Sequence, residues 1–135
     1  MQSQELSKLM QASAQDARLY AAEQHQLHLT GDLASLAHVD ELLSRLHTDQ
    51  QAKPHSGEML FTLCNIMGAY VGEIFIQNVG GQWQSNNSDQ AAPYMAVGFG
   101  DKEFPFASVC YHKIAHDNSI SLQEYVQQAK QNAMQ

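Results

Sequence analysis

Apolar residues are distributed unevenly along the chain, and the longest stretch that is dense in them is 60–83. Apolar residues recur there mostly three and four positions apart, and the strict alternation of a half-buried strand is absent. The pattern predicts a buried central helix over 58–79. Polar side chains interrupt the run and no Lys or Arg flanks it closely, so we interpret it as a core helix, not a membrane span.

Two further stretches with helical spacing precede the central helix. Residues 3–28 form a largely polar helix, and residues 33–47 carry a cleaner apolar stripe. Gly31 is a candidate C-cap for the first helix and Asp32 a candidate N-cap for the second. Because the connection is short, we expect the two helices to pack as an antiparallel hairpin over 3–47, followed by a polar loop.

After the central helix the pattern predicts short strands and two more helices. Alternating residues at 82–84 and 94–99, with a third short strand at 103–104, indicate a small antiparallel sheet within 82–104. Helices are expected over 105–117 and 121–133. The expected fold is therefore α+β and mainly helical, with five helices and a two- to three-stranded sheet packed on the central helix. The whole chain, 1–135, is expected to be one domain.

Gly68 and Gly72 lie four positions apart on one face of the predicted central helix. Glycine in a helix costs about 1 kcal/mol relative to alanine, so we expect another backbone to pack closely there, within the chain or across a homodimer. Glu73 lies beside this face. Two interpretations stay open: it contacts a ligand or acts as an acid in a pocket with Trp83, or it accepts hydrogen bonds from backbone amides.

The net charge of the chain limits which class of macromolecule it is expected to bind. The 135 residues include 7 Lys and Arg against 14 Asp and Glu, a net charge of −7. Nucleic-acid phosphates are bound by clustered basic residues, so the expected partner is a basic protein, not a nucleic acid, and the charge would speed that encounter. Candidate contacts around the loops of the predicted sheet are Asp89, Tyr94, Asp101 and Glu103; the polar face of the first helix is another.

Two histidines and two cysteines are the candidates for metal or thiol chemistry. His112 and His116 have the spacing that places two imidazoles on one helix face. Lys113, however, stands where the zinc-protease motif has glutamate, and spacing marks no third ligand. We therefore interpret both histidines as surface residues, with no metal and no cofactor. Cys64 and Cys110 fall in apolar helices and are expected to be buried free thiols.

The remaining motifs favour binding over catalysis. No phosphate-binding loop, dinucleotide fingerprint or serine-hydrolase elbow occurs, so an enzyme is not expected. The first ten residues lack the charged start and apolar core of a signal peptide. Together with the two thiols, this predicts a cytoplasmic protein.

Four short motifs carry a resemblance to a family of small, mostly uncharacterised bacterial domains, over roughly residues 60–126. They are Gly68-Ala69-Tyr70-Val71-Gly72-Glu73, Gly80-Gly81-Gln82-Trp83, Phe104-Pro105-Phe106 with Val109, and Ser121-Leu122-Gln123-Glu124-Tyr125. Such domains are similar to immunity proteins of toxin systems in size, acidity and lack of catalytic motifs. The resemblance implies a protein that neutralises a secreted bacterial toxin by blocking its active site. The alternative is a small-ligand protein or enzyme using Glu73.

Overall fold

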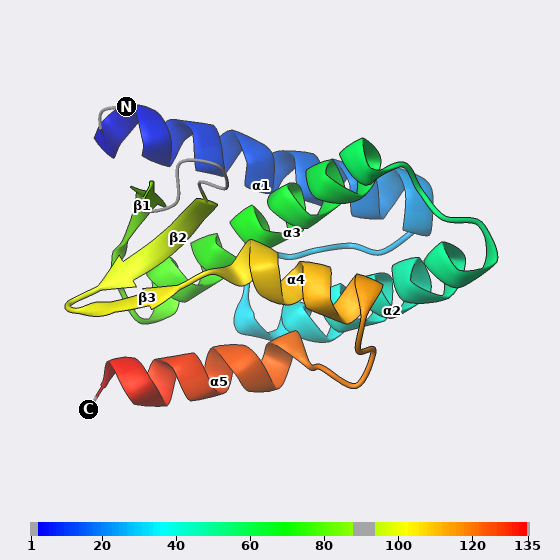
Figure 1. Ribbon diagram of the computed structural model, residues 1–135. Coiled ribbons are helices and arrows are strands. Elements are labelled where there is room, and N and C mark those ends of the chain that lie inside the picture. The colour runs from blue at the N-terminus through cyan, green and yellow to red at the C-terminus, as the bar shows by residue number, and fades with distance from the viewer. Residues whose placement is uncertain (1–2, 88–93, 135) are drawn as a thin grey trace.

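The computed structural model describes residues 3–87 and 94–134, and over these residues it has five α-helices and one three-stranded antiparallel sheet (Figure 1). The predicted α+β, mainly helical fold is confirmed. The helices are α1 (Ser3–His25), α2 (Leu36–Ala52), α3 (Gly57–Asn78), α4 (Phe106–Ala115) and α5 (Leu122–Ala133). The strands are β1 (Gln82–Asn86), β2 (Tyr94–Phe99) and β3 (Lys102–Phe104), and a short 3-10 helix, η1 (Leu33–Ser35), precedes α2.

Helix α3 forms the centre of the molecule, with α1 and α4 both packed on it (Figure 1). It begins at Gly57 because the Ser56 hydroxyl accepts a hydrogen bond from the Met59 N–H at 3.1 Å. It ends before Gly80 and Gly81, which both have positive φ, a backbone conformation that glycine adopts without strain. By length and composition α3 could cross a membrane, but 61% of its most apolar window is buried inside the protein, as in a core helix.

The predicted hairpin of the first two helices is wrong. Helix α1 ends at His25, three residues early, because Gln26 adopts a positive φ of 55° and the Leu27 N–H bonds to the Ala21 carbonyl. An irregular segment then buries Leu27 and Leu29 in the core. Since this segment separates the two helices, α1 packs on α3 whereas α2 packs on α4 and α5. Helix α2 also continues to Ala52, through residues predicted to be loop.

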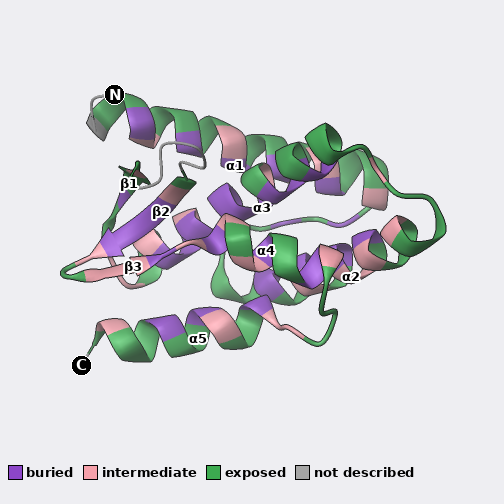
Figure 2. Ribbon diagram, viewed as in Figure 1, coloured by how far each residue is buried: buried purple, intermediate pink, exposed green. Residues whose placement is uncertain are grey.

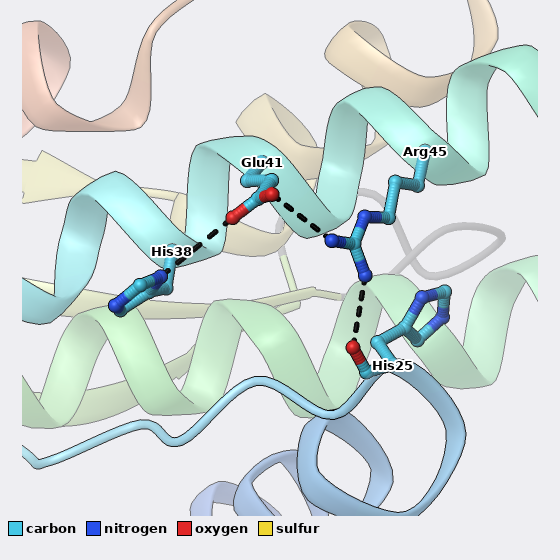
Figure 3. A network of polar contacts seen from close by, with 4 residues as sticks. All are labelled: His25, His38, Glu41 and Arg45. Carbon is cyan, nitrogen blue, oxygen red and sulfur yellow. Dashed lines mark hydrogen bonds and ion pairs between the residues drawn. The ribbon is translucent and has the colours of Figure 1, made fainter.

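A polar network connects the end of α1 to α2 instead (Figure 3). One nitrogen of the Arg45 guanidinium donates to the His25 carbonyl at 2.9 Å, and another donates to Glu41 at 2.9 Å. His38 lies on the far side of Glu41, with 3.7 Å between the facing atoms. Arg45 thus satisfies a carbonyl that the end of a helix leaves without an intrahelical partner.

The sheet has the strand order β1-β2-β3, with Gln82 opposite Gly98, Asn86 opposite Tyr94, and Val97 opposite Phe104. Strand β2 has the predicted bounds, whereas β1 is two residues longer than predicted and β3 one residue longer. One face carries residues that are buried in the core: Trp83, Val97 and Phe104. The other face is mostly polar. Figure 2 shows that the middle of β2 is buried, whereas its start is exposed.

The helix predicted over 121–133 is present as α5, one residue shorter at its start. The Ser121 hydroxyl accepts a hydrogen bond from the Glu124 N–H at 3.2 Å, and α5 begins at Leu122. Helix α4 is shorter than predicted, at 106–115, with Pro105 as its N-cap. Phe106 at its start packs against Phe75 of α3, with ring centroids 5.5 Å apart. This contact helps to fix α4 on the central helix.

Candidate functional site

The outer face of the sheet carries a hydrogen-bonded cluster centred on Glu103. Its carboxylate accepts hydrogen bonds from the Tyr94 hydroxyl, from the Asn86 amide at 3.1 Å and from the Gln84 amide at 3.1 Å. Glu103 pairs with Gly98 across the strands, and a Cβ at Gly98 would lie 2.4 Å from the Gln84 side chain. Glycine at 98 therefore leaves the space through which Gln84 reaches Glu103.

This cluster favours the charged form of Glu103. The hydrogen bond from Tyr94, followed by that from Asn86, holds the pKa of the Glu103 carboxyl below its ordinary value. The same bond is the main cause of a raised pKa at Tyr94. All three donors are neutral, and the ion pairs within 3–87 and 94–134 involve only His38, Glu41 and Arg45 on α2. The partly exposed Glu103 thus carries a negative charge that no described cation pairs with.

The structure brings together two of the four predicted contact residues. Tyr94 and Glu103 share the cluster, and Asp101 is exposed next to it in the turn between β2 and β3. Asp89 lies outside the described residues. Sequence reasoning missed Gln84 and Asn86, because neutral amides give no charge signal. Extending the alternation of β1 to Asn86 would have placed both on the face of Tyr94.

An apolar groove of about 390 Å³ lies beside this cluster, between α1, α3, the start of α4 and the sheet. We call it the Phe61 groove; its principal lining residues are Leu9, Phe61, Trp83, Tyr94, Met95 and Pro105. Phe61 is 67% exposed and Leu9 is 47% exposed. None of the residues that line the groove is charged. Tyr94 belongs to both features, since it borders the groove and donates its hydroxyl proton to Glu103.

The glycine face of α3 packs within the chain. A Cβ at Gly68 would lie 2.5 Å from the Ala107 backbone of α4, and a Cβ at Gly72 would lie 2.2 Å from the Trp83 ring. The close approach predicted from the two glycines is therefore present, with a backbone at Gly68 and an indole at Gly72. This face is already occupied and does not need a second copy of the chain to cover it.

Within the described part of the chain, Glu73 accepts a hydrogen bond from the indole N–H of Trp83 at 2.8 Å, and none from backbone amides as one interpretation expected. It is partly buried and borders a crevice of about 120 Å³ that Arg18 and Tyr70 also line. The carboxylate thus satisfies the polar end of a tryptophan that is only 6% exposed. The hydrogen bond to Trp83 gives Glu73 a structural role, and the crevice beside Glu73 is small.

The histidines and cysteines occupy different environments. His112 and His116 are exposed, with ring centroids 5.7 Å apart. The described ranges contain no group of three or more His, Cys, Asp or Glu that could hold a metal ion. Cys64 and Cys110 are buried free thiols. Burial raises the pKa of Cys64 to about 12 and that of Cys110 well above its ordinary value, so neither thiol is a nucleophile at neutral pH.

No protein-family model, curated protein or solved structure matches the chain. The resemblance to small bacterial domains therefore stays a prediction. The candidate site rests on the geometry and charge of this chain alone.

Proposed function

We propose that this chain is a protein-binding module that neutralises a basic partner protein, and that the partner is a secreted bacterial toxin whose active site it covers in the cytoplasm. The observation that carries the proposal is the ionised Glu103, held by neutral donors without a described cation, next to an exposed apolar groove. Apolar anchors surrounded by polar and charged residues are the usual composition of a protein interface.

The reactive side chains support binding over catalysis. Both thiols are protonated and buried, and Glu73, in the most apolar helix, accepts a hydrogen bond from Trp83. Glu103 and Asp101, in contrast, are accessible on the sheet and its turn. Their charges are of the sign that a basic active-site cleft attracts.

The mechanism we propose is occlusion. A net charge of −7 accelerates the approach of a basic protein over distances of about 10 Å at moderate ionic strength. On contact, Glu103 and Asp101 enter the basic cleft, and the surface around Tyr94 covers its mouth. The toxin is then blocked by exclusion of its substrate and not by any chemical change.

Affinity purification tests this function directly. The tagged full-length chain is used as bait in its cell of origin, and bound proteins are identified by mass spectrometry. We expect one stoichiometric basic protein whose retention falls as salt is raised from about 0.1 M to 1 M, because salt screens exposed charges. Recovery of no stoichiometric protein, or of an acidic one held equally well at high salt, would contradict the proposal.

A small-ligand protein or enzyme using Glu73 is the second candidate, and the crevice shared by Glu73 and Arg18 favours it. It predicts a ligand whose binding Glu73→Gln abolishes while the fold is retained. A screen of small molecules by thermal shift, comparing wild type with Glu73→Gln, tests it. Ligand-induced shifts that are the same in both proteins would remove this candidate.

A further inference from the structure

We infer that the Phe61 groove is the anchor site of the interface: it receives apolar side chains of the basic partner, while a neighbouring Lys or Arg of that partner pairs with Glu103. The inference rests on the proposed function and names the part of the surface that the partner contacts. Its two components are the apolar lining and the adjacent carboxylate.

The apolar component comes from side chains on two different helices. Leu9 of α1 and Phe61 of α3 border the same groove, and both expose about half or more of their surface, 47% and 67%. The helices contact each other extensively, so these side chains are held on a fixed backbone. A pre-formed concave surface of this kind suits insertion of an apolar anchor, because little conformational freedom is lost on binding.

The Glu103 carboxylate favours a partner that carries a Lys or Arg beside its apolar anchor. Tyr94 belongs to both components, because it lines the groove and its hydroxyl donates to Glu103. A partner seated in the groove therefore approaches a carboxylate that no described cation neutralises. Excluding water from that carboxylate is costly unless a cation arrives with the partner. An anchor flanked by Lys or Arg meets this requirement.

Nucleic acid and a second copy of this chain are less complementary in charge to the region around Glu103. Nucleic acid would bring phosphates towards Glu103, and a second copy of this chain would bring another net charge of −7. Both approaches place like charges together. The complementary occupant is a basic protein.

The test compares matched variants of the full-length chain against the purified partner that affinity purification identifies. Leu9→Ser, Phe61→Ser and Glu103→Gln alter the proposed anchor site. Leu19→Ser is the apolar control, because Leu19 lies on the same helix, is 49% exposed and does not line the groove. Glu124→Gln, an exposed carboxylate on α5, is the charge control. Circular dichroism and thermal melting verify that each variant is folded.

We expect each anchor-site variant to weaken binding by about tenfold or more in isothermal titration calorimetry, and each control by less than about twofold. The effect of Glu103→Gln should shrink at high salt. If no stoichiometric partner exists, the proposed function and this inference both fail. If the partner binds every variant equally, or Glu103→Gln has no effect, only the inference is overturned. A homodimer in sedimentation that Phe61→Ser dissociates would also overturn it.

Discussion

At the scale of single residues, the two helical glycines of α3 have a defined steric cause. Gly68 faces the Ala107 backbone, so Gly68→Ala would place a methyl group 2.5 Å from it. Overpacking of this kind typically costs about 1–3 kcal/mol of unfolding free energy. Urea denaturation should report a loss in that range.

Gly57→Ala is the matched control for this glycine prediction. A Cβ at Gly57 meets no atom within 4 Å, and Gly57 is the first residue of the same helix. That substitution should be neutral or stabilising by about 0.4–1 kcal/mol, because alanine restricts the unfolded chain. Equal losses in both variants would refute the steric explanation.

Glu73 should act on stability through Trp83. Glu73→Ala leaves the buried indole N–H without its acceptor, which should lower the free energy of unfolding by about 1–3 kcal/mol. Gln77→Ala, one turn later on α3 and at the same crevice, should change it by less than about 0.5 kcal/mol. Chemical denaturation followed by tryptophan fluorescence measures both. Similar stabilities for the two variants would show that the indole contact contributes little.

Residue-scale properties were partly predictable from the sequence. Glycine spacing on a helix is a local signal, and it correctly predicted a close approach at Gly68. The acceptor role of Glu73 towards Trp83 was not predictable, because it depends on how β1 turns back along α3. The burial of Lys113 was not predictable either, because it depends on how the chain turns after α4 and brings backbone carbonyls to the ammonium group. Lys113 is 3% exposed, and its Nζ donates to the carbonyls of Asn118 and Ile120.

At the scale of elements, α5 depends on a carboxylate from another helix. Asp40 of α2 accepts hydrogen bonds from the backbone N–H of Leu122 at 2.6 Å and of Gln123 at 3.1 Å. These donors belong to the first turn of α5, where no intrahelical acceptor exists. The Ser121 hydroxyl adds a third bond to Asp40 at 3.1 Å. A negative charge at this end also complements the helix dipole.

Asp40→Ala should therefore loosen α5. We expect a loss of about 1–3 kcal/mol in unfolding free energy and faster hydrogen exchange in α5. Glu41→Ala is the control at the adjacent position, because it removes only exposed ion pairs and should cost less than about 1 kcal/mol. Unchanged exchange rates in α5 for Asp40→Ala would contradict this assignment.

Element boundaries show where sequence reasoning succeeded and failed. The bounds of β2 follow from strand alternation, a local pattern, and were correct, and α5 begins within one residue of its predicted range, 121–133. The hairpin was wrong because the predicted first helix ran to residue 28 and included Leu27, whereas α1 ends at His25 and Leu27 and Leu29 lie in the irregular segment that follows. Their burial in a non-helical segment is decided by packing on the rest of the core, which the local pattern does not encode.

At the scale of the whole molecule, the buried thiols should make stability fall in alkali. The pKa of Cys64 is raised from 9.0 to about 12, so between these values the unfolded chain releases a proton that the folded chain keeps. The contribution of the Cys64 thiol to the free energy of unfolding is fully present below pH 9 and is lost as pH rises towards 12. About 1 kcal/mol of it is lost at pH 10. Urea midpoints at pH 7 to 10 should decline accordingly.

Cys64→Ala is the control for the alkaline effect. This variant loses stability at every pH because it creates a small cavity, but its decline between pH 8 and 10 should be shallower. Tyrosines with raised pKa values titrate mainly above this window. A decline of the same slope in wild type and Cys64→Ala would contradict the assignment to Cys64.

The candidate site was predictable only in part. Tyr94, Asp101 and Glu103, which charge and aromatic content marked as contacts, are exposed or partly exposed sheet and turn residues, and their contact with a partner stays a prediction. The Phe61 groove was not predicted, because Leu9 and Phe61 are far apart in sequence and each looks like a core residue of its own helix. Only the crossing of α1 and α3 leaves their side chains at the surface together.

The most direct test of the central claim is a growth assay with the partner protein that affinity purification identifies. The partner is expressed alone, with the wild-type chain, or with a chain carrying both Phe61→Ser and Glu103→Gln at equal abundance. We predict growth arrest by the partner alone, restored growth with the wild-type chain, and weak or absent rescue by the double variant. A partner that is harmless alone, or an arrest that the wild-type chain does not relieve, would contradict the account.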